Sequence, residues 1–129
     1  MRLSIIIVLF TIIAVTATGC ISSDQPPADL LEPRENSDAG ITITATYLPD
    51  ITDATAFEIK VTAHKDYNDA FGNISYLRDS GGKTYKPVSY EGGGGHHASG
   101  VLRFPKIDGK RFELVIQDVA GVKERVFKW

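Results

Sequence analysis

The chain has 129 residues, a formal net charge of −2, three histidines and a single cysteine. This length accommodates one domain with a short additional segment and excludes a second hydrophobic core. The negative net charge argues against nucleic acid as a partner, because phosphates require a clustered basic surface.

The first 19 residues have the three-part layout of a secretory signal. Arg2 supplies the positive start, an apolar run extends from Ile5 to Val15, and small residues precede Cys20. The run is too short to span a bilayer well, since a transmembrane helix needs roughly 20 apolar residues. We therefore expect residues 1–19 to be a cleaved signal peptide. The alternative is an uncleaved signal anchor.

Ala17-Thr18-Gly19-Cys20 resembles the lipobox of bacterial and archaeal lipoproteins. The resemblance implies cleavage before Cys20 and attachment of a lipid, with acyl chains such as palmitate, to its sulfur. Two or more acyl chains hold a protein stably at a membrane. We expect a chain that is lipid-anchored in the cell membrane on the extracytoplasmic side, with no thiol left for a disulfide.

The part after the leader is acidic. The leader holds one basic residue and no acidic one, so residues 20–129 carry 13 basic and 16 acidic side chains. This balance offers no polybasic attraction to an anionic membrane and leaves the lipid as the anchor.

Residues 20–39 have the composition of a disordered tether, rich in Ser, Asp, Pro and Glu. Leu30-Leu31 is the one apolar pair. It seeds a short helix, touches the domain or is incidental to the linker, and the last interpretation is favoured.

From residue 40 to residue 129 the chain alternates apolar and polar residues in short runs separated by turn residues. Pro87 suits an edge strand better than a central one. No segment has sustained helical periodicity. The expected strands cover residues 41–47, 55–63, 73–79, 85–91, 99–104, 111–118 and 122–129. About seven short strands in some ninety residues predict an all-β, immunoglobulin-like β-sandwich, with a small barrel as the alternative.

Several stretches of the predicted domain resemble uncharacterised prokaryotic lipoproteins and secreted modules. The stretches are Tyr-Lys-Pro-Val-Ser-Tyr-Glu-Gly at 85–92, Gly-His-His at 95–97, Gly-Val-Leu-Arg-Phe-Pro at 100–105, Val-Ala-Gly-Val at 119–122 and Arg-Val-Phe-Lys-Trp at 125–129. The resemblance implies an exported β-sandwich module without an established activity.

His64, His96 and His97 are the candidate metal ligands. Imidazole is the commonest metal ligand, and exported copper or zinc binders use histidine-rich loops. Adjacent histidines in a strand point to opposite faces, so joint binding requires the irregular backbone that Gly92 to Gly95 permits. The competing interpretation is that the imidazoles satisfy backbone groups and fix the glycine loop.

Two other site patterns are weak. Residues 66–73 contain the oxygen ligands of a calcium loop, but Ala70 breaks their alternation, so ordinary turn chemistry is favoured. Ser99, His97 and Asp108 are hydrolase residue types without a nucleophile elbow. We therefore expect no enzyme.

Tyr85, Tyr90, Gly94 and Gly95 form the expected partner-binding surface, next to a strand edge that could accept another strand. The leading hypothesis is a non-catalytic lipoprotein that binds or scaffolds an envelope protein partner and needs no cofactor. The alternative is a copper- or zinc-binding lipoprotein that uses the three histidines.

Overall fold

Most of the predicted strands form where apolar and polar residues alternate, but Asn73 and Ile74, expected in the strand at 73–79, belong to a helical turn. The computed structural model describes residues 28–129, so the predictions for the leader and for Cys20 concern residues outside this part. The strands are β1 (Arg34–Asp38), β2 (Ile41–Tyr47), β3 (Ala54–Ala63), β4 (Ser75–Asp79), β5 (Thr84–Tyr85), β6 (Ser89–Gly92), β7 (His97–Pro105), β8 (Phe112–Val119) and β9 (Val122–Lys128). The helices, α1 (Ala28–Leu31) and α2 (Phe71–Ile74), are each one turn long.

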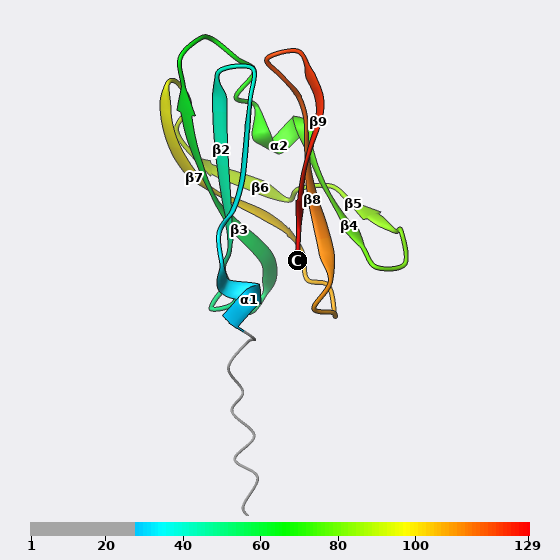
Figure 1. The fold of residues 1–129 in the computed structure, drawn as a ribbon. Coiled ribbons are helices and arrows are strands. Elements are labelled where there is room, and N and C mark those ends of the chain that lie inside the picture. The colour runs from blue at the N-terminus through cyan, green and yellow to red at the C-terminus, as the bar shows by residue number, and fades with distance from the viewer. Residues whose placement is uncertain (1–27) are drawn as a thin grey trace, which may run out of the picture.

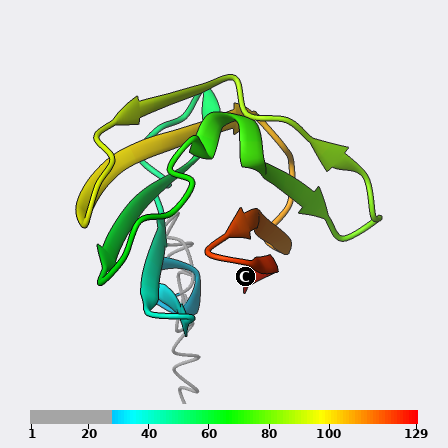
Figure 2. The same ribbon diagram turned by 90° about the horizontal axis from the view of Figure 1, so that it is seen from above.

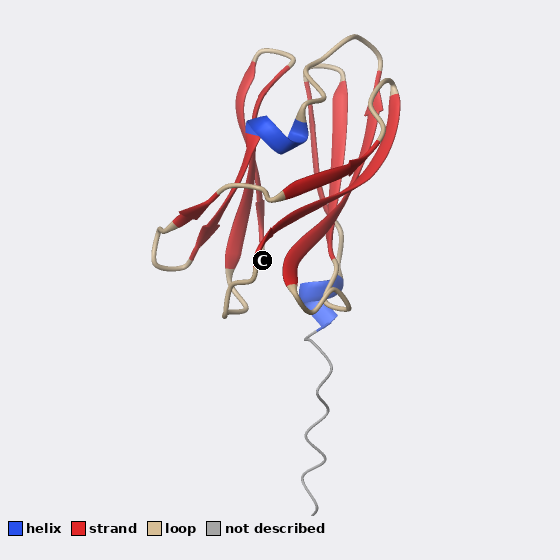
Figure 3. Cartoon of the chain, turned by 180° about the vertical axis from the view of Figure 1, so that it is seen from behind, coloured by secondary structure: helices blue, strands red, loops and turns tan. Residues whose placement is uncertain are grey.

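The strands form two antiparallel sheets that face each other (Figures 1 and 2). One sheet has the order β1-β2-β3-β7-β6 and the other the order β5-β4-β8-β9. Figure 3 shows α2 between the sheets near one end and α1 at the opposite end. We refer to these as the α2 end and the α1 end.

From β2 onward, the strand order is that of the immunoglobulin fold. β2, β3, β7 and β6 occupy the positions of strands A, B, E and D, and β5, β4, β8 and β9 those of C′, C, F and G. The predicted immunoglobulin-like β-sandwich is confirmed, with nine strands in place of about seven. The barrel alternative is wrong, because no strand pairing joins the two sheets within residues 28–129.

The core lies between the sheets, on the inward positions of each strand. In β2 the isoleucines at 41 and 43 are fully buried, whereas the threonines between them face outward. Phe57, Phe104, Phe112, Phe127 and Trp129 pack in or against this core. Tyr76 lies on the outer face of its sheet.

The outer position of Tyr76 follows from the pairing of β4 with β8. Tyr76 lies opposite Val115, on the face away from the buried Leu77 and Leu114. Its hydroxyl donates to Glu124 of β9 at 3.1 Å. Tyr76 therefore covers Val115, which is fully buried although it points outward.

The predicted disordered tether is wrong from Ala28 onward. Residues 28–31 form α1, whose Leu30 joins the core, and β1 pairs along its whole length with β2. The Leu30-Leu31 pair thus lies in a short helix that contacts the domain, and the favoured interpretation of an incidental pair is wrong. The remaining tether residues, 20–27, lie outside the described part of the chain.

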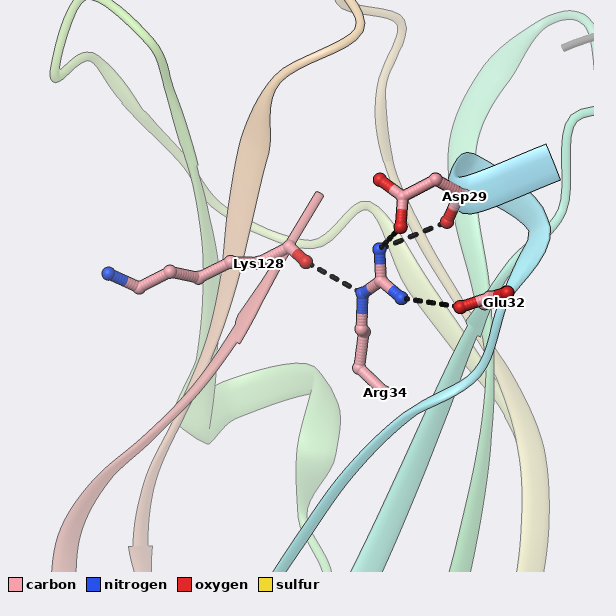
Figure 4. A network of polar contacts seen from close by, with 4 residues as sticks. All are labelled: Asp29, Glu32, Arg34 and Lys128. Carbon is pink, nitrogen blue, oxygen red and sulfur yellow. Dashed lines mark hydrogen bonds and ion pairs between the residues drawn. The ribbon is translucent and has the colours of Figure 1, made fainter. Parts of the chain in front are cut away.

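Arg34 connects this N-terminal segment to β9, an edge strand of the other sheet (Figure 4). Its Nε donates to the carbonyl of Lys128 at 2.8 Å, and its Nη2 donates to both the carbonyl and the carboxylate of Asp29 at 3.0 Å. Glu32 adds an ion pair at 3.7 Å. Polar contacts rather than an apolar stripe thus hold β1 in place.

The strand predicted for residues 85–91 is two strands in different sheets. Pro87 lies between β5, which pairs with β4, and β6, which pairs with β7. Proline cannot donate to a ladder, so it suits the point where the chain crosses between sheets. Both β5 and β6 are edge strands, as the position of Pro87 predicts.

No helix in residues 28–129 is long and apolar enough to cross a membrane.

Candidate functional site

The glycine run forms the hairpin between β6 and β7, at the α2 end. Gly92 lies opposite Gly100, and a Cβ at position 92 would lie 2.3 Å from the Gly100 Cα. The close approach of these two strands therefore requires glycine at this point. A Cβ at Gly100 would lie 2.5 Å from the Tyr90 hydroxyl oxygen, so Tyr90 fills the space that the second glycine leaves.

Two tyrosines hold the hairpin at its carbonyl groups. The Tyr90 hydroxyl donates to the Gly93 carbonyl at 3.0 Å, and the Tyr67 hydroxyl donates to the Gly95 carbonyl at 2.8 Å. Both rings also pack against the buried ring of Phe71 in α2. The loop thus has a specific hydrogen-bonded shape despite its glycine content.

Asp69 lies directly beside this hairpin. Its Oδ2 would be 1.8 Å from a Cβ at Gly94, so the carboxylate occupies the space of a missing side chain. Burial raises the pKa values of Tyr67 and Tyr90, and the negative charge of Asp69 raises them further. Both phenols therefore stay protonated as donors at neutral pH.

A small hollow of about 180 Å³ opens at this end. It is lined by Asp66, Tyr67, Asp69, Gly95 and His96. Nε2 of His96 lies 3.4 Å from Oδ1 of Asp66. The hollow combines carboxylates, an imidazole and a backbone carbonyl, and it suits hydrogen-bonding to a polar group of a partner.

The three histidines all belong to the α2 end and are all exposed. His97 lies opposite Thr62 at the start of β7, His96 faces Asp66, and the backbone N–H of His64 donates to the Gly40 carbonyl. Across residues 28–129, no group of three or more His, Cys, Asp or Glu side chains is placed to hold a metal ion. The copper or zinc site at His64, His96 and His97 stays a prediction.

The calcium-like segment folds as a turn. The Asn68 side chain accepts a hydrogen bond from the Ala70 N–H at 3.1 Å, and the Phe71 N–H donates to the Asp69 carbonyl. These bonds lead the chain into α2. They are the ordinary turn chemistry that the sequence favours.

The hydrolase residue types are divided between the two ends. His97 and Ser99 lie on the outer face of β7, opposite Thr62 and Lys60. Asp108 follows the other end of β7, in the connection to β8. The absence of enzyme activity stays a prediction.

The expected partner-binding residues do not form one surface. Tyr90, Gly94 and Gly95 share the β6–β7 hairpin, but Tyr85 belongs to the other sheet, where its hydroxyl donates to Asp79. Tyr90 is partly buried by Phe71 and is a support of the hairpin rather than an open contact residue.

A second hollow, of about 350 Å³, lies on the other sheet toward the α1 end and was not predicted. Side chains of β4, β8 and β9 line it with residues of the β4–β5 turn, the β7–β8 connection and Trp129. Across its floor, Glu113 accepts hydrogen bonds from Arg78 and pairs with Lys128 at 3.2 Å. These two cations lower the pKa of Glu113. Alternation places the three residues outward, but only the strand order brings them into one row.

No family model, no curated protein and no solved structure matches this chain. The resemblance to prokaryotic lipoproteins stays a prediction from the sequence.

Proposed function

We propose that this chain is a non-catalytic, lipid-anchored lipoprotein whose β-sandwich binds or scaffolds an envelope protein partner on the extracytoplasmic side of the cell membrane. The leader and the lipobox-like Ala17-Thr18-Gly19-Cys20 support the location. The separation of the two ends of the sandwich supports the binding role.

The chain reaches α1 at one end of the sandwich, whereas the β1–β2 turn and three further connections lie at the other end (Figure 1). The three further connections are β3–α2, β6–β7 and β8–β9. In immunoglobulin variable domains the equivalents of the first and third carry antigen-binding loops. This analogy concerns the fold alone. The hydrogen-bonded glycine hairpin and its hollow add a specific polar surface at the same end.

The reach of the chain between Cys20 and Ala28 and the length of the sandwich both suit a membrane-facing α1 end and a partner-facing α2 end. Seven residues separate Cys20 from Ala28, so the two Cα atoms are at most about 28 Å apart. A strand as long as the ten-residue β3 extends roughly 33 Å. A lipid on Cys20 would keep the α1 end near the bilayer and leave the α2 end free to meet a partner.

Site-specific photocrosslinking in native membranes tests the binding role. A photoreactive residue at exposed position His96 should form an adduct with a discrete envelope protein. The same residue at exposed position Thr84, in β5 of the other sheet, is the matched control and should not form that adduct. Equal adducts at both positions, or none at His96, would contradict the proposed binding end.

A further inference from the structure

Basic side chains outnumber acidic ones around the second hollow, near the α1 end. Arg111 and Lys128 are exposed and line the hollow of about 350 Å³, and the exposed Lys83 and Lys110 directly adjoin the lining residues Gly82 and Arg111 in the chain. We call these four basic residues, Lys83, Lys110, Arg111 and Lys128, the basic rim. Lys83 belongs to the β4–β5 turn, Lys110 and Arg111 to the β7–β8 connection, and Lys128 to β9. The acidic net charge of the chain conceals this local excess of cations.

The carboxylates beside the basic rim are already engaged. Asp79 accepts hydrogen bonds from the Tyr85 hydroxyl and from the backbone N–H groups of Gly81 and Lys83. These bonds, that of Tyr85 first, lower the pKa of Asp79. Glu113 is held by Arg78 and Lys128. Asp108, in the β7–β8 connection, is exposed and offsets one positive charge.

Lys110 and Arg111 form no ion pair with any residue from 28 to 129, so their donors face solvent. The Trp129 indole N–H, in the wall of the hollow, also has no partner there, but it is buried and does not belong to the exposed surface. The exposed Lys110 and Arg111 present hydrogen-bond donors and positive charge, which suit phosphate oxygens.

The basic rim is fixed relative to the point where the chain leads toward Cys20. Arg34 joins α1 to the Lys128 carbonyl (Figure 4). Its guanidinium also lies over the Trp129 ring at 5.8 Å. Asp29 and Glu32, the two acids that precede β1 within the described residues, both pair with Arg34. Glu35 and Asp38 of β1 are exposed acids outside these pairs. The short chain to Cys20 thus starts beside the same surface.

We propose that the basic rim rests on the anionic lipid headgroups of the membrane that carries the Cys20 anchor. This inference builds on the proposed function and specifies the orientation of the domain. Each basic residue near an anionic surface strengthens association about fivefold. The exposed Asp50 and Asp53 lie in the β2–β3 connection of the other sheet, so the domain tilts its β8 and β9 side toward the lipid.

The test uses the chain from Cys20 onward, coupled through its single thiol to a maleimide lipid. The vesicles contain phosphatidylcholine, either alone or with about 30% phosphatidylglycerol. A headgroup spin-labelled lipid quenches Trp129, the only tryptophan, when the α1 end approaches the surface. We expect at least about twofold lower fluorescence on the anionic vesicles, and loss of the difference in about 0.5 M salt.

A triple variant, Lys83→Gln with Lys110→Gln and Arg111→Gln, should abolish the difference. Its matched control is Lys60→Gln with Lys65→Gln and Lys123→Gln, which removes the same charge at exposed positions away from the rim and should keep the difference. Circular dichroism confirms that both variants fold. Equal quenching on the two vesicle types, or equal loss in both variants, would overturn the proposal. Chemical coupling makes the result independent of whether cells attach lipid to Cys20.

Discussion

Arg125 is a fully buried cation whose hydrogen-bond acceptors are all neutral oxygens. Its Nη1 donates to the Asn36 side chain at 2.9 Å and to the Ile41 carbonyl at 3.0 Å, and its Nη2 donates to the Asp38 carbonyl at 2.9 Å. Burial lowers the pKa of its guanidinium, although the nearby Asp38 raises it. One residue of β9 thereby holds both sides of the β1–β2 turn.

Replacing Arg125 tests this role. We expect Arg125→Met to lower the free energy of unfolding by about 2 kcal/mol, because it leaves buried carbonyls without donors. Lys123→Met, at an exposed position of the same strand, should change it by less than about 0.5 kcal/mol. Urea denaturation measures both values. An Arg125→Met variant as stable as the wild type would contradict the role of this side chain.

The glycine run has two kinds of position. A Cβ at Gly92 meets the backbone of Gly100 and of Ser99, whereas a Cβ at Gly93 meets nothing within 4 Å. Backbone atoms in a paired strand cannot move aside as the tip of a side chain can. Adjacent glycines should therefore differ strongly in their tolerance of alanine.

We expect Gly92→Ala to destabilise the domain by about 2 kcal/mol, as overpacking does. Gly93→Ala should be neutral or slightly stabilising, because it reduces the freedom of the unfolded chain. Thermal unfolding of the two variants, followed by circular dichroism, compares them directly. Equal destabilisation would mean that the run serves flexibility rather than close strand approach.

Among the elements, β1 shows why part of the fold is not predictable from the sequence. Arg-Glu-Asn-Ser-Asp contains no apolar residue, so no hydrophobic period marks it as a strand. It forms because its backbone pairs with β2 while Arg34 and Asn36 bind residues of β9. By contrast, the alternation in β2, β3 and β8 directly reflects one buried face, which is why these strands were predicted.

For the candidate sites, the sequence indicated individual residues but not the contacts between them. The glycine run and the histidines stand out in the sequence, but the bond from Tyr67 to Gly95 joins residues 28 positions apart. The row of Arg78, Glu113 and Lys128 likewise depends on which strands become neighbours. Composition marks candidate residues, and only the topology decides which of them meet.

Truncation tests the contribution of the N-terminal elements. A domain that begins at Gly40, the boundary expected from composition, lacks α1 and β1 and removes two of the three acceptors of Arg125. We expect it to be at least about 3 kcal/mol less stable than a domain that begins at Ala28, or not to fold. Urea titrations of the two domains decide, and coincident curves would contradict a structural role for residues 28–39.

The β4–β5 hairpin and the neighbouring ion pairs should make stability depend on acid. The folded pKa values of Asp79 and Glu113 are lowered, so their contribution is present above the ordinary carboxyl pKa of about 4 and is lost as pH falls through the folded values. Between about pH 4 and pH 2, the Asp79→Asn variant should lose stability less steeply than the wild type. Urea denaturation across this range measures the slopes, with exposed Asp50→Asn as the control that should follow the wild type.

At the scale of the whole molecule, the sandwich has two ends with different surfaces. The α2 end carries the glycine hairpin, the histidines and the small polar hollow, and the α1 end carries the basic rim. Only seven residues separate Cys20 from Ala28, so an anchor at Cys20 would lie close to the α1 end and far from the α2 end. Under the proposed function, a lipid at Cys20 would hold the α1 end near the membrane and leave the α2 end free for a partner.

Lipid attachment at Cys20 is therefore the central claim, and metabolic labelling tests it most directly. The full chain, produced in its own cells with a radioactive lipid precursor, should carry the label and sediment with membranes. The Cys20→Ala variant should lose the label. An unlabelled wild-type chain, or a Cys20→Ala variant that keeps the label, would contradict the account.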